Sequence, residues 1–231
     1  MFRGSLVALI TPFRNGEIEE TAFQELVAWQ VAQGTHGFVP CGTTGESPAL
    51  HDDEARRIIT LCVEVAKGRA PVIAGTGTNS TDHTIALTHQ AKEAGADAAL
   101  IVCPYYNKPT QEGLFHHFKA VHDAVDLPII IYNIPGRSAV DMTNATMARL
   151  AKLPNIMGVK DATNDLARPL RMRGEIGAGF CLLSGEDATA VAYLAHARAS
   201  AGADLYASGT GHLRQCLHRR HRHDLPGLCC S

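Results

Sequence analysis

The chain has 231 residues, of which 45% are hydrophobic and 19% are charged. This length suits one domain with a sizeable core and is short for two ordinary domains joined by a linker. The formal net charge is -2, so no overall positive field favours nucleic acid or an anionic membrane surface. The composition fits a small, neutral partner better.

Neither a membrane span nor a disulfide framework is expected. No run approaches the roughly 18 consecutive apolar residues that a membrane span needs, and no cleavage site of small residues follows the N-terminus. Cys41, Cys62, Cys103 and Cys181 lie in apolar segments without CxxC spacing, which argues against disulfides or structural zinc there. We therefore expect an unexported, cytoplasmic protein.

Short apolar runs alternate with helix-like stretches along most of the chain. The runs are continuously apolar, which is typical of strands buried on both faces of a parallel sheet. The expected strands are 6–10, 37–40, 71–74, 99–102, 128–131, 156–159 and 180–183. The expected amphipathic helices are 20–33, 52–67, 80–94, 111–125, 143–152 and 166–173.

This α/β alternation fits a doubly wound sheet or a (β/α)8 TIM barrel. The first strand-to-helix turn lacks a Gly-rich phosphate fingerprint, and polar residues follow many strands instead of meeting at one crevice. The sequence therefore favours the barrel, with seven strands recognisable.

The composition changes after Ala195. The last 36 residues hold five of the twelve His, three of the seven Cys and five Arg, with no Lys or Glu. Only residues 203–207 show a weak strand pattern there. We predict a barrel domain at 1–195 and an atypical tail at 196–231, with the eighth strand altered or missing.

Lys160 is the first candidate for chemistry. It follows the strand at 156–159, at the strand end where barrels place reacting groups. A free lysine, with a pKa of about 10.4, is almost wholly protonated at neutral pH, but an apolar pocket favours the neutral amine, which can attack a carbonyl. The predicted chemistry is a Schiff base. The alternative is a strand-end lysine with its ammonium in solvent.

Tyr132 and Arg137 lie just after the strand at 128–131. A phenol can move a proton to or from a carbinolamine, and a guanidinium can bind a carboxylate with two parallel hydrogen bonds. Together they suit a reaction of an oxo-acid. The alternative is a tyrosine at the edge of the core and an arginine on a surface loop.

Two further loops follow strands. Residues 42–47 read Gly-Thr-Thr-Gly-Glu-Ser, so Thr43 and Thr44 could present backbone amides to a carboxylate, or the segment could be a turn that caps a helix. Tyr105 and Tyr106 stand between two prolines, in a stiff loop whose rings could meet a partner chain or pack on their own barrel.

Metal sites are not expected. The side chains of His116 and His117 point apart on a helix, and His218, His221 and His223 lie in the atypical tail. We predict adventitious metal binding at most.

Four ordered segments carry a family resemblance: 42–47, 104–109 (Pro-Tyr-Tyr-Asn-Lys-Pro), 132–137 (Tyr-Asn-Ile-Pro-Gly-Arg) and 158–161 (Gly-Val-Lys-Asp). From about Met1 through Ala195 the chain resembles the dihydrodipicolinate synthase family. The resemblance implies a cofactor-free lyase of lysine and diaminopimelate biosynthesis. In it Lys160 forms an imine with pyruvate, and the derived enamine attacks the aldehyde of L-aspartate 4-semialdehyde.

The resemblance also assigns roles. It implies a proton relay of Tyr132, Thr43 and Tyr106, with Tyr106 reaching the site of a neighbouring subunit in a homo-oligomer, a dimer or tetramer. Thr44 would hold the pyruvate carboxylate and Arg137 that of the semialdehyde. Gly185, in the segment Ser-Gly-Glu at 184–186, would line the floor of the pyruvate pocket. No nucleic acid or membrane partner is implied.

Sugar-acid aldolases of the same superfamily are the alternative activity, and Arg137 favours the semialdehyde branch. Lysine-inhibited members have an allosteric pocket that Ser47, Asn79 and Tyr105 match. Asp52, Ala55 and His83 replace the histidines and glutamate of strongly inhibited members, which predicts weak feedback by lysine.

The tail departs from the family pattern, which expects an eighth strand and a helical C-terminal region. Residues from His196 onward read like a translation of another reading frame. Loss of one strand would expose two strand edges of the barrel. A catalytically inactive remnant is therefore the second hypothesis.

Overall fold

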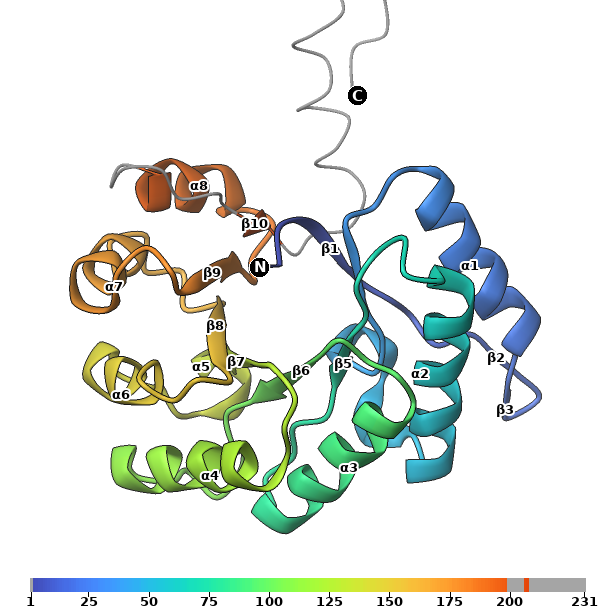
Figure 1. Cartoon of the computed structure of the whole chain (residues 1–231), viewed down its shortest axis with the longest axis horizontal. Coiled ribbons are helices and arrows are strands. Elements are labelled where there is room, and N and C mark those ends of the chain that lie inside the picture. The colour runs from blue at the N-terminus through green and yellow to red at the C-terminus, as the bar shows by residue number, and fades with distance from the viewer. Residues whose placement is uncertain (1, 199–205, 208–231) are drawn as a thin grey trace, which may run out of the picture.

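The computed structural model describes residues 2–198 and 206–207, and its strands form a central barrel surrounded by helices (Figure 1). The barrel strands are β1 (Gly4–Ala8), β4 (Gly37–Val39), β5 (Ile73–Gly75), β6 (Ala98–Val102), β7 (Ile129–Asn133), β8 (Ile156–Asp161), β9 (Cys181–Ser184) and β10 (Tyr206–Ala207). The helices are α1 (Glu20–Ala32), α2 (Asp52–Ala66), α3 (Thr81–Glu93), α4 (Gln111–Ala124), α5 (Pro135–Ser138), α6 (Asn144–Leu150), α7 (Arg168–Ile176) and α8 (Ala190–Arg198).

The described strands close on themselves. The sheet runs in the order β4-β1-β10-β9-β8-β7-β6-β5, and every barrel pairing is parallel. Its two ends meet where Phe38 N donates to Pro71 O and Gly75 N donates to Pro40 O, both at 2.9 Å. The expected (β/α)8 barrel is confirmed.

The eighth barrel position is filled by β10. This strand pairs with β9 on one side and with β1 on the other, and it lies within the weak strand pattern at 203–207. Two residues of it are described, so an eighth strand, predicted as altered or missing, is present. The rest of the predicted tail lies outside the described residues, except for 196–198, which continue α8 past the predicted boundary at 195.

Sequence patterns located the elements well, with differences at their ends. α7 runs three residues beyond the predicted end at 173, because Pro169 is accepted in the first turn and Gly177, with φ of 100°, terminates the helix. A small hairpin, β2 (Phe13–Arg14) and β3 (Glu17–Ile18), was not predicted. Its turn is Asn15-Gly16, both at positive φ, the usual chemistry of a two-residue hairpin loop.

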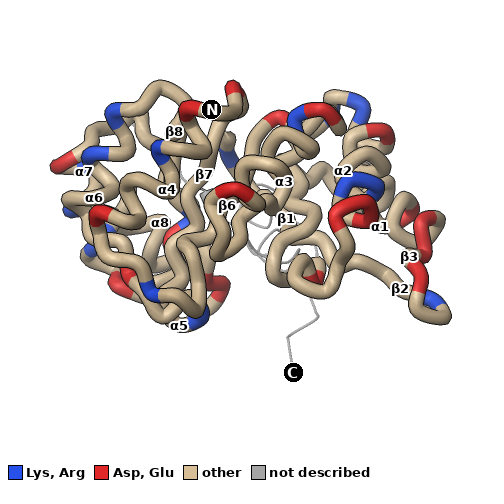
Figure 2. The backbone as a smooth tube through the Cα atoms, turned by 90° about the horizontal axis from the view of Figure 1, so that it is seen from below, with Lys and Arg blue, Asp and Glu red and all other residues tan. Residues whose placement is uncertain are grey.

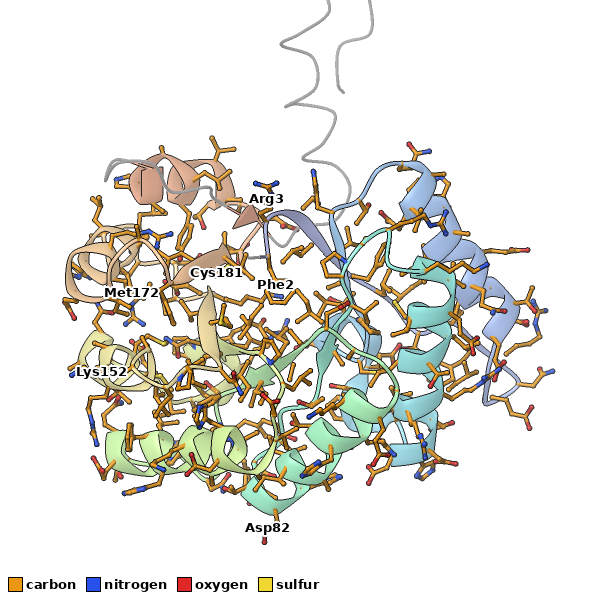
Figure 3. All side chains as sticks on the ribbon, in the orientation of Figure 1. Phe2, Arg3, Asp82, Lys152, Met172 and Cys181 are labelled. Atoms are coloured by element: carbon orange, nitrogen blue, oxygen red, sulfur yellow. The ribbon has the colours of Figure 1, made fainter. Side chains whose placement is uncertain are left out.

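Apolar side chains fill the barrel and the layer beneath its helices. The inner cluster includes Leu6, Ile73, Leu100 and Ile130, together with the ring of Tyr132. Figure 3 shows this dense interior, with Asp82 at the outer end of α3. Cys181 Sγ lies 3.5 Å from the carbonyl of Phe2, so the N-terminal segment packs under the barrel floor.

Charged residues mark the outer helices and loops, whereas most strand segments carry other residue types (Figure 2). Across the described chain, none of the helices combines the length and apolar character needed to cross a bilayer.

Candidate active site

Lys160 lies in β8, one residue before its end. The side chain is buried, with 9% of its surface exposed. Burial lowers the pKa of the amine to about 8, and the charge of Asp187 partly opposes this shift. The ammonium is therefore not solvated, and a useful fraction of the amine is neutral near physiological pH.

Tyr132 is the register partner of Lys160 across β7 and β8. Lys160 Nζ lies 4.6 Å from the centroid of the Tyr132 ring. Burial raises the pKa of the phenol, while the positive charge of Arg137 and a hydrogen bond with Thr43 act in the opposite direction. The phenol thus keeps its proton at neutral pH and lies where it can exchange that proton with a group on the amine.

Gly185 adjoins the same amine. A Cβ at this position would lie 2.9 Å from Ala162 Cβ and 3.2 Å from Lys160 Cε. The Gly185 amide donates to Asp161 O at 2.7 Å, which holds the segment after β9 against the end of β8. The missing side chain therefore leaves the volume that the lysine stem occupies.

Thr43 and Thr44 begin the short 3-10 helix η1 (Thr43–Gly45) that follows β4. The first hydrogen bond within this turn is donated by Gly45 N to Gly42 O, at 3.0 Å. The backbone amides of Thr43 and Thr44 precede it and therefore have no acceptor within the turn. Thr11 Oγ1 donates to Gly45 O at 2.8 Å and fixes the loop to the end of β1. This geometry fits the predicted capture of a carboxylate.

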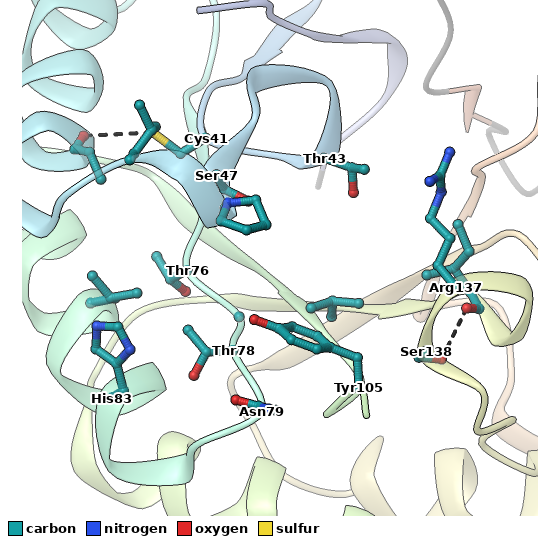
Figure 4. A pocket seen from close by; sticks show the side chains of 18 of the residues that line it. Cys41, Thr43, Ser47, Thr76, Thr78, Asn79, His83, Tyr105, Arg137 and Ser138 are labelled. Carbon is teal, nitrogen blue, oxygen red and sulfur yellow. Dashed lines mark hydrogen bonds between the residues drawn. The ribbon is translucent and has the colours of Figure 1, made fainter. Parts of the chain in front are cut away.

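A cavity of about 360 Å³ lies beside the barrel mouth (Figure 4). Five of the predicted site residues line this cavity, and they come from four separate loops: Thr43, Ser47, Asn79, Tyr105 and Arg137. A smaller cavity of about 30 Å³ reaches inward between Thr43 and Tyr132. Lys160, Gly185 and Thr44 line neither of these two cavities, but the ring of Tyr132, which lines the smaller one, lies next to the Lys160 amine.

The two tyrosines after β6 diverge. Tyr105 is half-buried and lines the larger cavity. Tyr106 is 88% exposed and has φ of 73°, a left-handed conformation that is unfavourable for a bulky residue. Within the described chain Thr43 and Tyr132 thus line one small cavity, whereas Tyr106, which the prediction places in the site of a neighbouring subunit, is exposed.

The segment after β5 contributes a wall of the larger cavity that was not predicted from the sequence. Thr76, Thr78 and the glycine between them line the larger cavity, and Thr76 Oγ1 is hydrogen-bonded to Thr88 Oγ1 at 2.9 Å. The signal was the Gly-Thr-Gly-Thr sequence at 75–78 directly after an expected strand, where polar residues belong to the barrel mouth.

Fold and site together define the class. A (β/α)8 barrel with a buried amine at one strand end, a phenol beside it and an arginine-edged cavity above is built for lysine-based chemistry on a carbonyl acid.

Comparisons with known proteins give the family. The sequence model of the Dihydrodipicolinate synthetase family matches residues 1–219. A 4-hydroxy-tetrahydrodipicolinate synthase of Rhodospirillum centenum is 74% identical over 195 residues, which cover 84% of this chain and 67% of that protein. The synthase of Parvibaculum lavamentivorans is 64% identical over 196 residues, or 85% of this chain and 67% of the relative.

Comparison with solved structures gives the same family. The crystal structure of dihydrodipicolinate synthase from Acinetobacter baumannii, complexed with pyruvate, superimposes with a TM-score of 0.86 at 45% identity, covering 91% of this chain and 70% of that one. The Aquifex aeolicus enzyme gives a TM-score of 0.85 at 45% identity, covering 90% and 69%. The chain belongs to the dihydrodipicolinate synthetase family, and it spans about two thirds of the length of these relatives.

Proposed function

We propose that this chain is a Schiff-base lyase that condenses pyruvate with L-aspartate 4-semialdehyde to 4-hydroxy-tetrahydrodipicolinate, a step of lysine and diaminopimelate biosynthesis in the cytoplasm. The observation that carries the proposal is the buried amine of Lys160 in register with Tyr132. The names of the relatives and the pyruvate-complexed neighbour support it.

In the proposed reaction the neutral amine of Lys160 attacks the keto carbon of pyruvate to give a carbinolamine. The Tyr132 phenol donates a proton to the departing hydroxyl, water leaves, and an imine forms. The Tyr132 phenolate left by that step takes a proton from the pyruvate methyl group, which gives an enamine. The enamine carbon bonds to the aldehyde carbon of the second substrate, and the Tyr132 phenol returns the proton to the aldehyde oxygen, which becomes the hydroxyl of the product. The amino group of that substrate then attacks the imine carbon, closes the ring and releases the lysine.

Substrate carboxylates have two proposed anchors. Thr44, in the short helix η1, would hold that of pyruvate, and Arg137, at the wall of the larger cavity, would hold that of the semialdehyde. Gly185 would form the floor beside the lysine stem. The relay is completed in a homo-oligomer, dimer or tetramer, in which the exposed Tyr106 enters the site of the neighbouring subunit.

Borohydride trapping tests the proposal directly. The protein is incubated with pyruvate and borohydride, and the intact mass is compared with that of a Lys160→Ala control. A reduced pyruvyl adduct on the wild type alone is expected. A soluble, folded chain that gains no adduct would instead support the inactive remnant. Replacing the semialdehyde with sugar aldehydes in a turnover assay tests the alternative aldolase activity.

We also propose the division into a barrel domain, 1–195, and an atypical tail, 196–231, which supplies the short strand β10 to the barrel and is translated from another reading frame. The support is the abrupt change of composition after Ala195. Resequencing the gene tests it: an uninterrupted frame that encodes the same tail would contradict the proposal.

A further inference from the structure

A polar row lies directly behind the catalytic row of the barrel. Asn133 and Asp161 are register partners one step beyond Tyr132 and Lys160. Because side chains alternate along a strand, this second pair faces the surrounding helices instead of the barrel interior. Asn133 is 1% exposed, so its amide must find partners within the protein.

Those partners belong to the segment that follows α5. Asn133 Nδ2 donates to Asp141 Oδ1 at 2.8 Å, and Met142 N donates to Asn133 Oδ1 at 3.2 Å. The bonds tie the end of β7 to the residues just before α6 and close residues 133–142 into a loop. Within that loop Ser138 Oγ lies 2.9 Å from the carbonyl oxygens of both Ile134 and Val140, and its single hydrogen can be donated to either.

The loop carries Arg137. Its backbone amide donates to Ile134 O at 3.0 Å, and Ile134, Arg137 and Ser138 all line the larger cavity (Figure 4). Arg137 itself is exposed, so the direction of its side chain depends on the position of this short segment more than on packing around the guanidinium.

A second element braces the loop from outside. Arg168, the first residue of α7, donates from both terminal nitrogens to the carboxylate of Asp141, each at 2.7 Å. It also donates to Met142 O at 3.2 Å, and its side chain is 12% exposed. Burial alone would raise the pKa of Asp141, but hydrogen bonds from Arg168 and Asn133 and the charge of Arg168 outweigh it and lower the pKa.

We propose that Asp141 and Arg168 are positioning residues that act through Asn133. They hold the loop of residues 133–142 so that Arg137 faces the larger cavity and binds the carboxylate of the second substrate. The inference rests on the proposed function. A preformed loop avoids the entropy cost of ordering Arg137 at each encounter, which favours binding of that carboxylate. Asp141 and Arg168 line neither the larger nor the smaller cavity, so imine formation should not depend on them.

Asp141→Asn tests this positioning, since it keeps the shape of the side chain but removes the charge that both Arg168 nitrogens bind. The matched control is Glu112→Gln, which weakens the equally bidentate pair of Glu112 with Arg149, at 2.7 and 3.0 Å, between α4 and α6. We expect Asp141→Asn to raise KM for L-aspartate 4-semialdehyde by about tenfold, with the rate of pyruvyl adduct formation within about twofold of wild type. Glu112→Gln should change neither quantity.

Two further readouts separate positioning from general loss of structure. Arg168→Lys keeps the charge but cannot make the bidentate contact, so its KM should lie between those of wild type and Asp141→Asn. Exchange of the Arg137 and Ser138 backbone amides should accelerate in Asp141→Asn and not in Glu112→Gln. This second readout requires no turnover.

The outcomes are distinct. If the wild type forms the adduct and Asp141→Asn has an unchanged KM for the semialdehyde, the inference is overturned while the proposed function stands. The inference is also overturned if Asp141→Asn forms the adduct more slowly and has a higher KM for both pyruvate and L-aspartate 4-semialdehyde, in proportion to a lower melting temperature. The Asp141–Arg168 pair would then be merely structural. If the wild type forms no adduct, the proposed function fails and the inference fails with it.

Discussion

Lys160 and Tyr132 face one another from adjacent strands, with the lysine Nζ 4.6 Å from the centre of the phenol ring. The ring can stabilise an ammonium by a cation–π contact, yet burial of the amine still lowers the pKa of Lys160 to about 8. The pair therefore combines a partly neutral nucleophile with a phenol that keeps its proton, because burial raises the pKa of Tyr132.

This balance predicts the pH dependence of imine formation. Only the neutral amine attacks, so the rate of adduct formation with saturating pyruvate should rise about tenfold per pH unit below the pKa and level off above about 8. Initial trapping rates measured across that range with cyanoborohydride give the midpoint. A midpoint near the ordinary lysine value of 10.5 would contradict the buried, activated amine.

The same burial has a cost in stability. Below pH 8 the native state holds a buried ammonium, and between about 8 and 10.5 the unfolded chain binds more protons than the folded one, so the free energy of unfolding should rise with pH there. Lys160→Met removes the buried charge. We expect it to abolish the adduct and to raise the melting temperature at neutral pH by about 5 °C.

Thermal melts of the wild type and Lys160→Met at neutral and strongly alkaline pH check this prediction. The difference between the two proteins should shrink as the lysine of the wild type loses its proton. An equal or lower melting temperature for the variant at neutral pH would show that the ammonium is adequately compensated in the native state.

We expect that replacing Gly185 even by alanine impairs the site. In Gly185→Ala the new Cβ would crowd Lys160 Cε, at 3.2 Å, and Ala162 Cβ, at 2.9 Å, so the lysine stem must shift. We expect at least a tenfold slower formation of the adduct and a loss of stability of about 1 to 3 kcal/mol.

Gly174→Ala is the matched control for that substitution. Gly174 lies within α7, and a Cβ there meets no atom within 4 Å. Alanine should stabilise the helix by about 0.5 to 1 kcal/mol and leave adduct formation unchanged. Adduct rates and denaturant melts of both variants decide, and equal behaviour of the two would remove Gly185 from the site.

Local patterns predicted the strands and the strand-end positions of the candidate residues, whereas the roles of those residues came from the family resemblance. The run at 156–159 is continuously apolar and ends in a lysine, which suffices to place Lys160 at a barrel mouth. Asp141 and Arg168 could not be paired in this way, since they come from different loops and only the closed barrel brings them together. The left-handed backbone of Tyr106 was likewise not predictable from local composition, although the sequence offers an exposed ring at this loop as one of two alternatives.

The larger cavity, which Arg137 also lines, shows both the reach and the limit of such patterns. Ser47, Asn79 and Tyr105, matched by resemblance alone, line one cavity, and the departing residues Asp52, Ala55 and His83 line it too. Asp52 Oδ1 lies 3.0 Å from His83 Nε2. This contact with His83 occupies the Asp52 carboxylate. Because the two residues are 31 positions apart in the sequence, the contact was not evident from the sequence.

This pairing supports weak inhibition by lysine. The ammonium of a bound lysine would compete with His83 for the Asp52 carboxylate, and Ala55 offers no hydrogen bond to the ligand. Titration of L-lysine into the condensation assay should show little inhibition below millimolar concentration. The triple variant Asp52→His, Ala55→His, His83→Glu should become at least tenfold more sensitive. Submillimolar inhibition of the wild type would contradict the prediction, because the cavity would then bind lysine despite its paired carboxylate.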